Sequence, residues 1–170
     1  MNVDFLINGE ATGGAEGKTY DRLDPMTGEL ATRAAAATVE DATRAVDAAD
    51  AAFQTWSKTG PGERRDLLMK AADAMEAKVE AFTAAVIAET GATGPWAGFN
   101  VMLAAGMIRE AAAMTTQISG EAIPSNKPNT LAMAVRKPKG VCLGMHLGMR
   151  QSFLARVPSQ WLLPAAIPSS

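Results

Sequence analysis

The sequence is poor in the residues that build disulfides, metal sites and nucleic-acid surfaces. It has one cysteine and one histidine in 170 residues, so no intrachain disulfide is possible and the histidine has no evident ligand or triad partner. Aromatic residues make up only 5%, the net charge is -2, and no basic stripe is present, so we expect no nucleic-acid partner. A single thiol suits a reducing compartment, which predicts a cytoplasmic protein.

Long hydrophobic runs are also missing. Residues 90–108 carry no charge, but they contain several glycines, Pro95 and Asn100 and little leucine or isoleucine. A membrane-spanning helix needs about 20 strongly apolar residues, so we interpret this stretch as a loop and a buried helix and expect no membrane partner. The first residues show no signal-peptide pattern. Hydrophobic residues at 48% and charged residues at 20% are typical of a globular domain.

The first 37 residues carry strand and turn signals. Phe5 to Ile7, followed by Asn8 and Gly9, predict a strand that enters a tight turn. The segment 24–29, which contains Pro25, predicts a second turn between two short strands. A cluster of glycines at 13, 14 and 17 marks a loop. It is weak evidence for phosphate binding because no helical pattern follows it directly.

Helical periodicity begins at Thr38, where Thr38 and Asp41 predict a capping box. A second helical region covers residues 63–89, with a kink or short break left open inside it and Gly91 as its stop. A third covers residues 97–117. The first helix should bury one face made of Ala42, Ala45, Val46, Ala49, Phe53 and Trp56.

After Gly120 the pattern changes to short strands. Residues 121–124 and 130–136 predict two strands around a turn. Residues 141–145 predict a short buried strand, which makes Cys142 a buried structural thiol. The remainder, residues 146–170, has no clear period, and His146 within it is interpreted as incidental. We therefore divide the chain into an ordered segment, 1–145, and an irregular tail, 146–170.

Seven short motifs follow one another in an order that resembles the NAD(P)-dependent aldehyde dehydrogenases. Each motif is modest alone, but the series is specific and covers most of the chain. Trp96 to Asn100 and residues 104–116 look most like the branch that acts on aromatic aldehydes such as salicylaldehyde or vanillin. The motifs are Phe5-Leu6-Ile7-Asn8-Gly9-Glu10, Asp24-Pro25-Met26-Thr27-Gly28-Glu29, Ala52-Phe53-Gln54-Thr55-Trp56, Glu63-Arg64-Arg65-Asp66-Leu67-Leu68, Glu89-Thr90-Gly91, Gly120-Glu121-Ala122-Ile123-Pro124 and Pro138-Lys139-Gly140-Val141.

The resemblance implies an α/β fold of which this chain holds only part. It would supply the N-terminal helical part of the cofactor-binding domain, a hairpin from Glu121 to Arg136 of the kind that joins subunits, and one strand of an incomplete doubly wound sheet. In the family a cysteine nucleophile, a glutamate base and an oxyanion-hole asparagine act on the aldehyde with NAD or NADP. The resemblance places none of them within these 170 residues, so we expect no catalytic, cofactor-binding or metal-binding residue here.

The resemblance breaks after Gly144, where the family continues Ile-Ala-Pro-Trp-Asn. A shift of reading frame explains the break: when codons for Met145 to Met149 are read two bases later, they can spell Ala-Pro-Trp-Asn. The bases of Met145 and His146 force the alanine, and Gly148 supplies the GG of the tryptophan codon. We therefore interpret the tail as out of frame, through a mutation, a decayed gene or a sequencing error. Codons for residues 145–149 that do not give this shifted reading would contradict the hypothesis.

The remaining candidate residues are substrate contacts. In the family, the helix after Gly94 and Pro95 lines the tunnel to the nucleophile, so the resemblance places Trp96, Phe99 and Leu103 there for an aromatic aldehyde. The alternative is that all three are core residues at helical spacing. Glu40, Asp41, Glu76, Glu80 and Glu89 are interpreted as helix caps or solvated charges.

Three hypotheses about the whole chain follow. It is an enzyme fragment without dehydrogenase activity of its own, or a non-catalytic module that forms a homo-oligomer through residues 121–136. In the third, the chain is not stable, because its helices expose faces that were meant to be covered.

Overall fold

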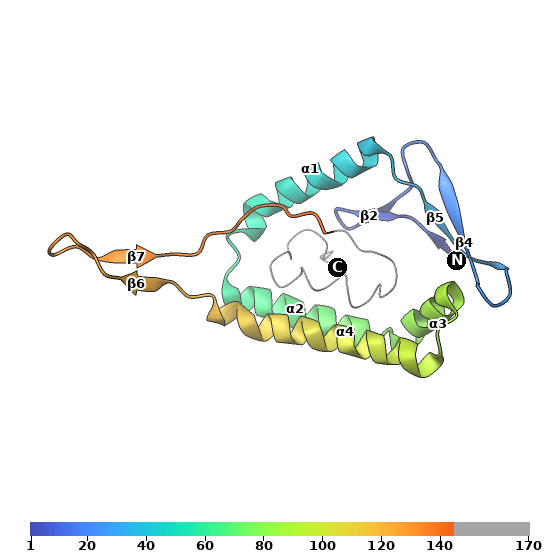
Figure 1. Ribbon diagram of the computed structural model, residues 1–170. Coiled ribbons are helices and arrows are strands. Elements are labelled where there is room, and N and C mark those ends of the chain that lie inside the picture. The colour runs from blue at the N-terminus through green and yellow to red at the C-terminus, as the bar shows by residue number, and fades with distance from the viewer. Residues whose placement is uncertain (145–170) are drawn as a thin grey trace.

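The computed structural model describes residues 1–144, and Met145, His146 and the tail 146–170 discussed above lie outside the described residues. Small β-sheets stand at one end, helices form the body, and a hairpin projects from the other end (Figure 1). The strands are β1 (Asn2–Val3), β2 (Phe5–Ile7), β3 (Glu10–Thr12), β4 (Thr19–Leu23), β5 (Leu30–Ala35), β6 (Glu121–Ile123) and β7 (Ala132–Ala134). The helices are α1 (Val39–Trp56), α2 (Pro61–Glu76), α3 (Val79–Thr90), α4 (Gly94–Met114) and the short 3-10 helix η1 (Thr115–Gln117).

Turn chemistry shapes the N-terminal strands. β2 and β3 pair antiparallel with Ile7 opposite Glu10, which leaves Asn8 and Gly9 as the two-residue turn. Both have positive φ, 52° and 81°, as this tight turn requires. β5 is the middle of a mixed three-stranded sheet, antiparallel to β4 and parallel to β1. The strands predicted at Phe5–Ile7 and on both sides of the turn 24–29 are confirmed, whereas neither β1 nor β3 was predicted.

The predicted helix start at Thr38 and the predicted helix stop at Gly91 are both present. Thr38 and Asp41 form the expected capping box at the start of α1. The second helical region is broken at Ala77 and Lys78 into α2 and α3, and Gly91 ends α3 in the left-handed conformation with φ 66°. α4 lies along α2 and α3, and the ribbon of Figure 1 shows α2 and α4 side by side.

The buried core is thin and made mostly of small side chains. Val101 is the largest side chain that is fully buried among the described residues. α1 buries less than its pattern predicts, because Ala49 is buried and Phe53 and Trp56 are half-buried, whereas Ala42, Ala45 and Val46 are exposed. Alanine therefore sets the packing, chiefly on α4, through Ala35, Ala49, Ala72, Ala97, Ala104, Ala105, Ala111 and Ala112.

The β6–β7 hairpin projects away from the helices (Figure 1). Glu121 pairs with Ala134 and Ile123 with Ala132, so the predicted hairpin is confirmed as an element. A Cβ atom on Gly120 would lie 2.6 Å from the carbonyl oxygen of Ala134, so only glycine fits where the two strands leave the body.

The strand predicted at residues 141–145 is wrong where the structure describes it. Residues 141–144 form no strand, Leu143 is 81% exposed, and Cys142 is exposed and not buried. A strand of a parallel sheet is buried only when neighbouring strands and helices cover both faces, and no described element covers these residues. Across residues 1–144, no helix has the length and apolar character that a bilayer crossing needs.

Candidate functional site

The long helix α4 has two faces of different character. At 3.6 residues per turn, Gly94, Ala97, Gly98, Val101 and Ala105 fall on one face. Ala97, Val101 and Ala105 are each no more than 1% exposed. Cβ atoms on Gly94 and Gly98 would lie 3.9 Å from Ile87 Cδ1 and 3.7 Å from Thr83 Oγ1. This face therefore packs on α3 and α2 through small side chains.

The three predicted substrate contacts share the opposite face of α4. Trp96, Phe99 and Leu103 are spaced i, i+3 and i+7, which places them in one stripe. Trp96 is 42% exposed, Phe99 is 62% exposed and Leu103 is half-buried. Trp96 and Phe99 are therefore not core residues of the described structure, and their exposed rings form an apolar surface.

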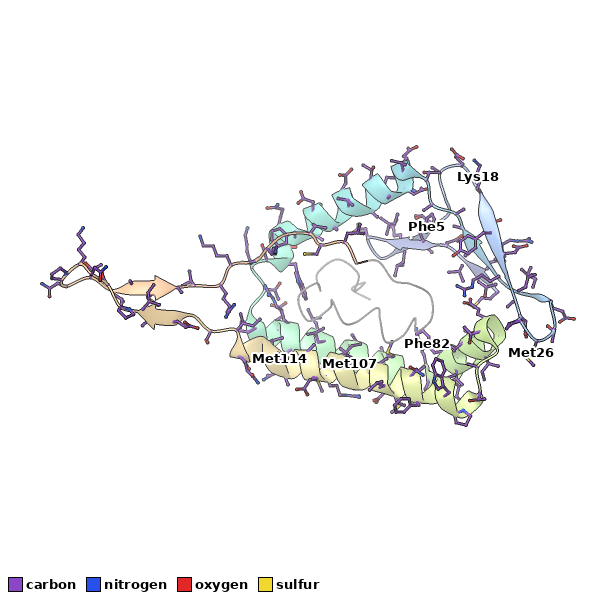
Figure 2. The ribbon with its side chains drawn as sticks, in the orientation of Figure 1. Phe5, Lys18, Met26, Phe82, Met107 and Met114 are labelled. Atoms are coloured by element: carbon purple, nitrogen blue, oxygen red, sulfur yellow. The ribbon has the colours of Figure 1, made fainter. Side chains whose placement is uncertain are left out.

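Two methionines that the sequence analysis missed continue this stripe along α4. Met107 follows Leu103 by one helical turn and is half-buried, and Met114 is 40% exposed. Figure 2 labels both along α4. The signal that identifies them is the same helical spacing, carried about three turns beyond Leu103. We call Trp96, Phe99, Leu103, Met107 and Met114 the apolar stripe of α4.

One polar contact lies within α4, and others join α4 to α2. Asn100 is buried and its Nδ2 donates to the carbonyl oxygen of Trp96 at 2.8 Å. Arg109 Nη2 donates to Asp73 Oδ1 at 2.7 Å and to Glu76 Oε2 at 2.8 Å, while its Nη1 also contacts Glu76. These bonds raise the pKa of Arg109, chiefly through Glu76, and Arg109 lowers the pKa of Glu76. Glu76 is thus an interhelical partner and not the solvated charge that its helical position predicted.

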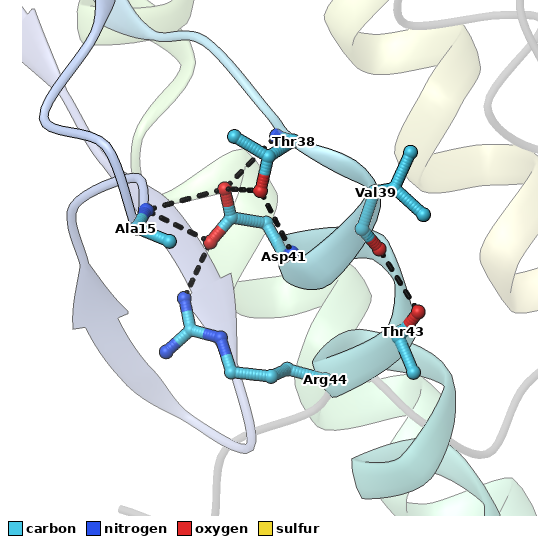
Figure 3. Close-up of polar contacts among 6 residues, drawn as sticks. All are labelled: Ala15, Thr38, Val39, Asp41, Thr43 and Arg44. Carbon is cyan, nitrogen blue, oxygen red and sulfur yellow. Dashed lines mark hydrogen bonds and ion pairs between the residues drawn. The ribbon is translucent and has the colours of Figure 1, made fainter.

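Asp41 has a role in structure and not in catalysis (Figure 3). Its side chain is 2% exposed, and its oxygens accept from the Ala15 amide at 3.0 and 3.2 Å, the Thr38 amide at 2.9 Å and Arg44 Nη2 at 2.6 Å. The backbone bond from Thr38 is the main reason that the pKa of Asp41 falls from 3.8 to about 2. A carboxylate with a pKa this low is a poor proton acceptor near neutral pH.

Cys142 lacks the surroundings of a catalytic nucleophile. It is exposed, and its Sγ lies 3.9 Å from the carbonyl oxygen of Gly140. A catalytic thiol is activated by a neighbouring base, a cation or a helix N-terminus, and the described structure places none beside Cys142. No group of three or more His, Cys, Asp or Glu side chains in residues 1–144 is placed to hold a metal ion.

Comparison with known proteins settles the family. The model of the aldehyde dehydrogenase family matches residues 12–146. The chain belongs to the aldehyde dehydrogenase family. It is 55% identical over 145 residues to a vanillin dehydrogenase of Pseudomonas sp. (strain HR199 / DSM 7063). The aligned region covers 85% of this chain and 30% of that protein.

Solved structures agree with this membership. A salicylaldehyde dehydrogenase from Pseudomonas putida G7, complexed with salicylaldehyde, superposes with a TM-score of 0.79 at 45% identity, covering 81% of this chain and 28% of that one. PnpE in complex with nicotinamide adenine dinucleotide superposes with a TM-score of 0.71 at 35% identity, covering 74% and 26%. This aldehyde dehydrogenase chain thus spans about 30% of the length of such relatives.

Proposed function

We propose that this chain supplies the substrate-facing helix of an enzyme that oxidises an aromatic aldehyde to an acid with NAD or NADP. We further propose that the 170-residue polypeptide alone does not catalyse that reaction. The observation that carries the substrate class is the apolar stripe of α4, where Trp96 and Phe99 stand exposed one turn apart. Flat aromatic rings favour such partners through stacking and desolvation. The named substrates of the relatives, vanillin and salicylaldehyde, are of this class.

The missing activity follows from the residues present. Hydride transfer from an aldehyde requires a thiolate that first adds to the carbonyl, together with donors for the oxyanion and a base for hydrolysis. Cys142 is the single thiol of the sequence and has no base beside it. The cofactor finds no built site either, because the glycine loop 13–17 leads into β4 and not into a helix N-terminus that would hold a pyrophosphate.

The test is an assay of the purified 170-residue chain. We expect no NAD or NADP reduction with salicylaldehyde or vanillin above the rate of the Cys142→Ser variant, because both proteins lack an activated nucleophile. Absorbance of the reduced nicotinamide measures this directly. Turnover that disappears in Cys142→Ser would contradict the proposal, because Cys142 would then be a nucleophile.

A second candidate function is that of an oligomerisation module. The β6–β7 hairpin projects from the body, and its apolar side chains Ile123, Leu131, Met133 and Val135 are 46%, 76%, 59% and 62% exposed. A two-stranded sheet with unpaired edges and apolar side chains favours pairing with another chain.

Size-exclusion chromatography with light scattering tests this module. We expect the 170-residue chain to form a defined oligomer and Met133→Lys to shift it toward monomer, because a charge opposes burial of that strand face. Lys127→Met in the hairpin turn serves as control. A monomeric parent chain would contradict the oligomerisation role, and soluble aggregate in every variant would favour the hypothesis of an unstable chain.

We also propose that the chain divides into an ordered segment, 1–145, and a tail, 146–170, and that the reading frame changes after Gly144. The match to the family ends at residue 146, two residues beyond Gly144, which supports a change at this point. The single thiol supports action in the reducing cytoplasm.

A further inference from the structure

The first turn of α4 contains Pro95 and packs through the buried Ala97, but it has no side-chain cap. Thr93 is its N-cap residue but makes no side-chain capping bond, and the turn contains no acidic side chain. α1 differs, since its capping box ties Thr38 and Asp41 together. The free N–H groups at a helix start leave the end prone to fraying when nothing caps them. The direction of Trp96, which lies in this turn, therefore depends also on what holds the segment before it.

That segment is held by the N-terminal sheet. Arg22 on β4 lies 3.3 Å, Nε to Oε2, from Glu89 in the last turn of α3, and these side chains are only 33% and 15% exposed. A Cβ atom on Gly91 would lie 3.1 Å from Cγ of Pro25. Glu89 is thus a bridge between α3 and the sheet, and not the solvated charge that its position on the helix predicted.

The turn that lies beside Gly91 is held by its own hydrogen bonds. The Asp24 amide donates to the carbonyl oxygen of Glu29 at 2.8 Å, and the Gly28 amide donates to that of Asp24 at 2.8 Å. The Met26 amide donates to Asp24 Oδ1 at 2.7 Å. Pro25 further restricts the backbone. Figure 2 labels Met26 at this turn, next to α3. These hydrogen bonds and Pro25 restrict the conformation of the turn that packs against Gly91.

We propose that Arg22, Glu89 and the Pro25 turn are positioning residues that set the direction of the first turn of α4 and so place Trp96 against the aldehyde. The catalytic meaning of this placement rests on the proposed function. The chain of contacts runs from β4 through Glu89 and Gly91 into the turn that carries Trp96. Misplacement of a substrate contact by about 1 Å is enough to cost an enzyme on the order of a hundredfold in rate, so such a brace matters beyond stability.

The test uses the full 170-residue chain labelled with 5-fluorotryptophan and observed by fluorine NMR. Trp96 is the reporter, assigned with Trp96→Phe, and Trp56 at the end of α1 is the internal reference. The resonance of the third tryptophan, Trp161, is assigned with Trp161→Phe. We expect Glu89→Gln and Arg22→Gln each to shift or split the Trp96 resonance while the Trp56 resonance stays in place. The exchanged pair, Arg22→Glu with Glu89→Arg, should restore the Trp96 signal.

Arg33→Gln is the matched control, because it removes the Asp21–Arg33 ion pair within the same sheet, which does not bridge to α3. An unmoved Trp96 signal in both single variants overturns the proposal, and so does an equal shift in Arg33→Gln. Should Glu89→Gln also move Trp56, the chain has unfolded as a whole and Pro25→Ala decides: it must move Trp96 alone. No aldehyde is present, so this result is independent of the activity assay, and either proposal can fail while the other stands.

Discussion

An enzyme that reduces NAD or NADP with aromatic aldehydes is expected when residues 1–144 are joined in frame to the part of the Pseudomonas vanillin dehydrogenase that follows its matched region. The family resemblance implies that the joined part supplies the cysteine, the asparagine and the glutamate of the reaction. Loss of a catalytic nucleophile costs an enzyme on the order of 10⁶-fold in kcat. We therefore expect a gain of at least about a thousandfold over the 170-residue chain.

The joined enzyme also tests the apolar stripe. Trp96→Ala should raise KM for vanillin or salicylaldehyde about tenfold, the upper range of what one aromatic contact contributes, and should leave KM for a short aliphatic aldehyde nearly unchanged. Trp56→Phe, at the other end of the helical body, is the control. An inactive joined enzyme, or an equal loss for both classes of aldehyde, would contradict the proposed role of α4.

Asp41→Asn is expected to lower the melting temperature of the 170-residue chain by about 5–10 °C. The reason lies in Figure 3: one buried carboxylate joins the loop at Ala15, the cap at Thr38 and the side chain of Arg44. An amide of the same shape carries no charge and places a donor where Asp41 has an acceptor, so at least one of these bonds is lost. Circular dichroism at 222 nm measures the transition.

The effect of Asp41 should depend on pH with a definite sign. Its pKa lies at about 2 in the folded chain against 3.8 normally, so the ionised form stabilises the fold fully above about pH 4. This contribution is lost as the pH falls from about 4 toward 2. The melting temperatures of parent and Asp41→Asn should therefore converge in that window. Glu40→Gln, an exposed neighbour in the first turn of α1, is the control and should shift the melting temperature by no more than about 1 °C. A constant difference at all pH values would contradict the account.

Features that are local in the chain were predictable from the sequence. The capping box at Thr38, the tight turn at Asn8 and the stop at Gly91 each depend on a few adjacent residues whose chemistry is legible without a structure. The placement of Trp96, Phe99 and Leu103 on one face followed from helical spacing alone. Their exposure did not, because it depends on which other elements cover them.

Features that join distant segments were not predictable. The bond from Ala15 to Asp41 and the ion pairs of Glu76 and Glu89 link residues far apart in the chain, and nothing in a helical pattern says which charge meets which. Cys142 was predicted to be buried and is exposed, because burial also depends on distant segments. An apolar run predicts burial only if neighbours exist to bury it, and the described chain provides none for that residue.

The division of α4 into a face of glycine and alanine and a face of large apolar side chains separates two kinds of evolutionary freedom. On the first face, Ala97, Val101 and Ala105 are almost fully buried, so larger side chains at these positions would overpack the contact with α2 and α3. On the second face, side chains at 96, 99 and 103 can change in size and shape without disturbing the packing of α4 on α2 and α3. Under the proposed function, substitutions on this second face would therefore change which aldehydes are accepted while the packing of α4 is kept.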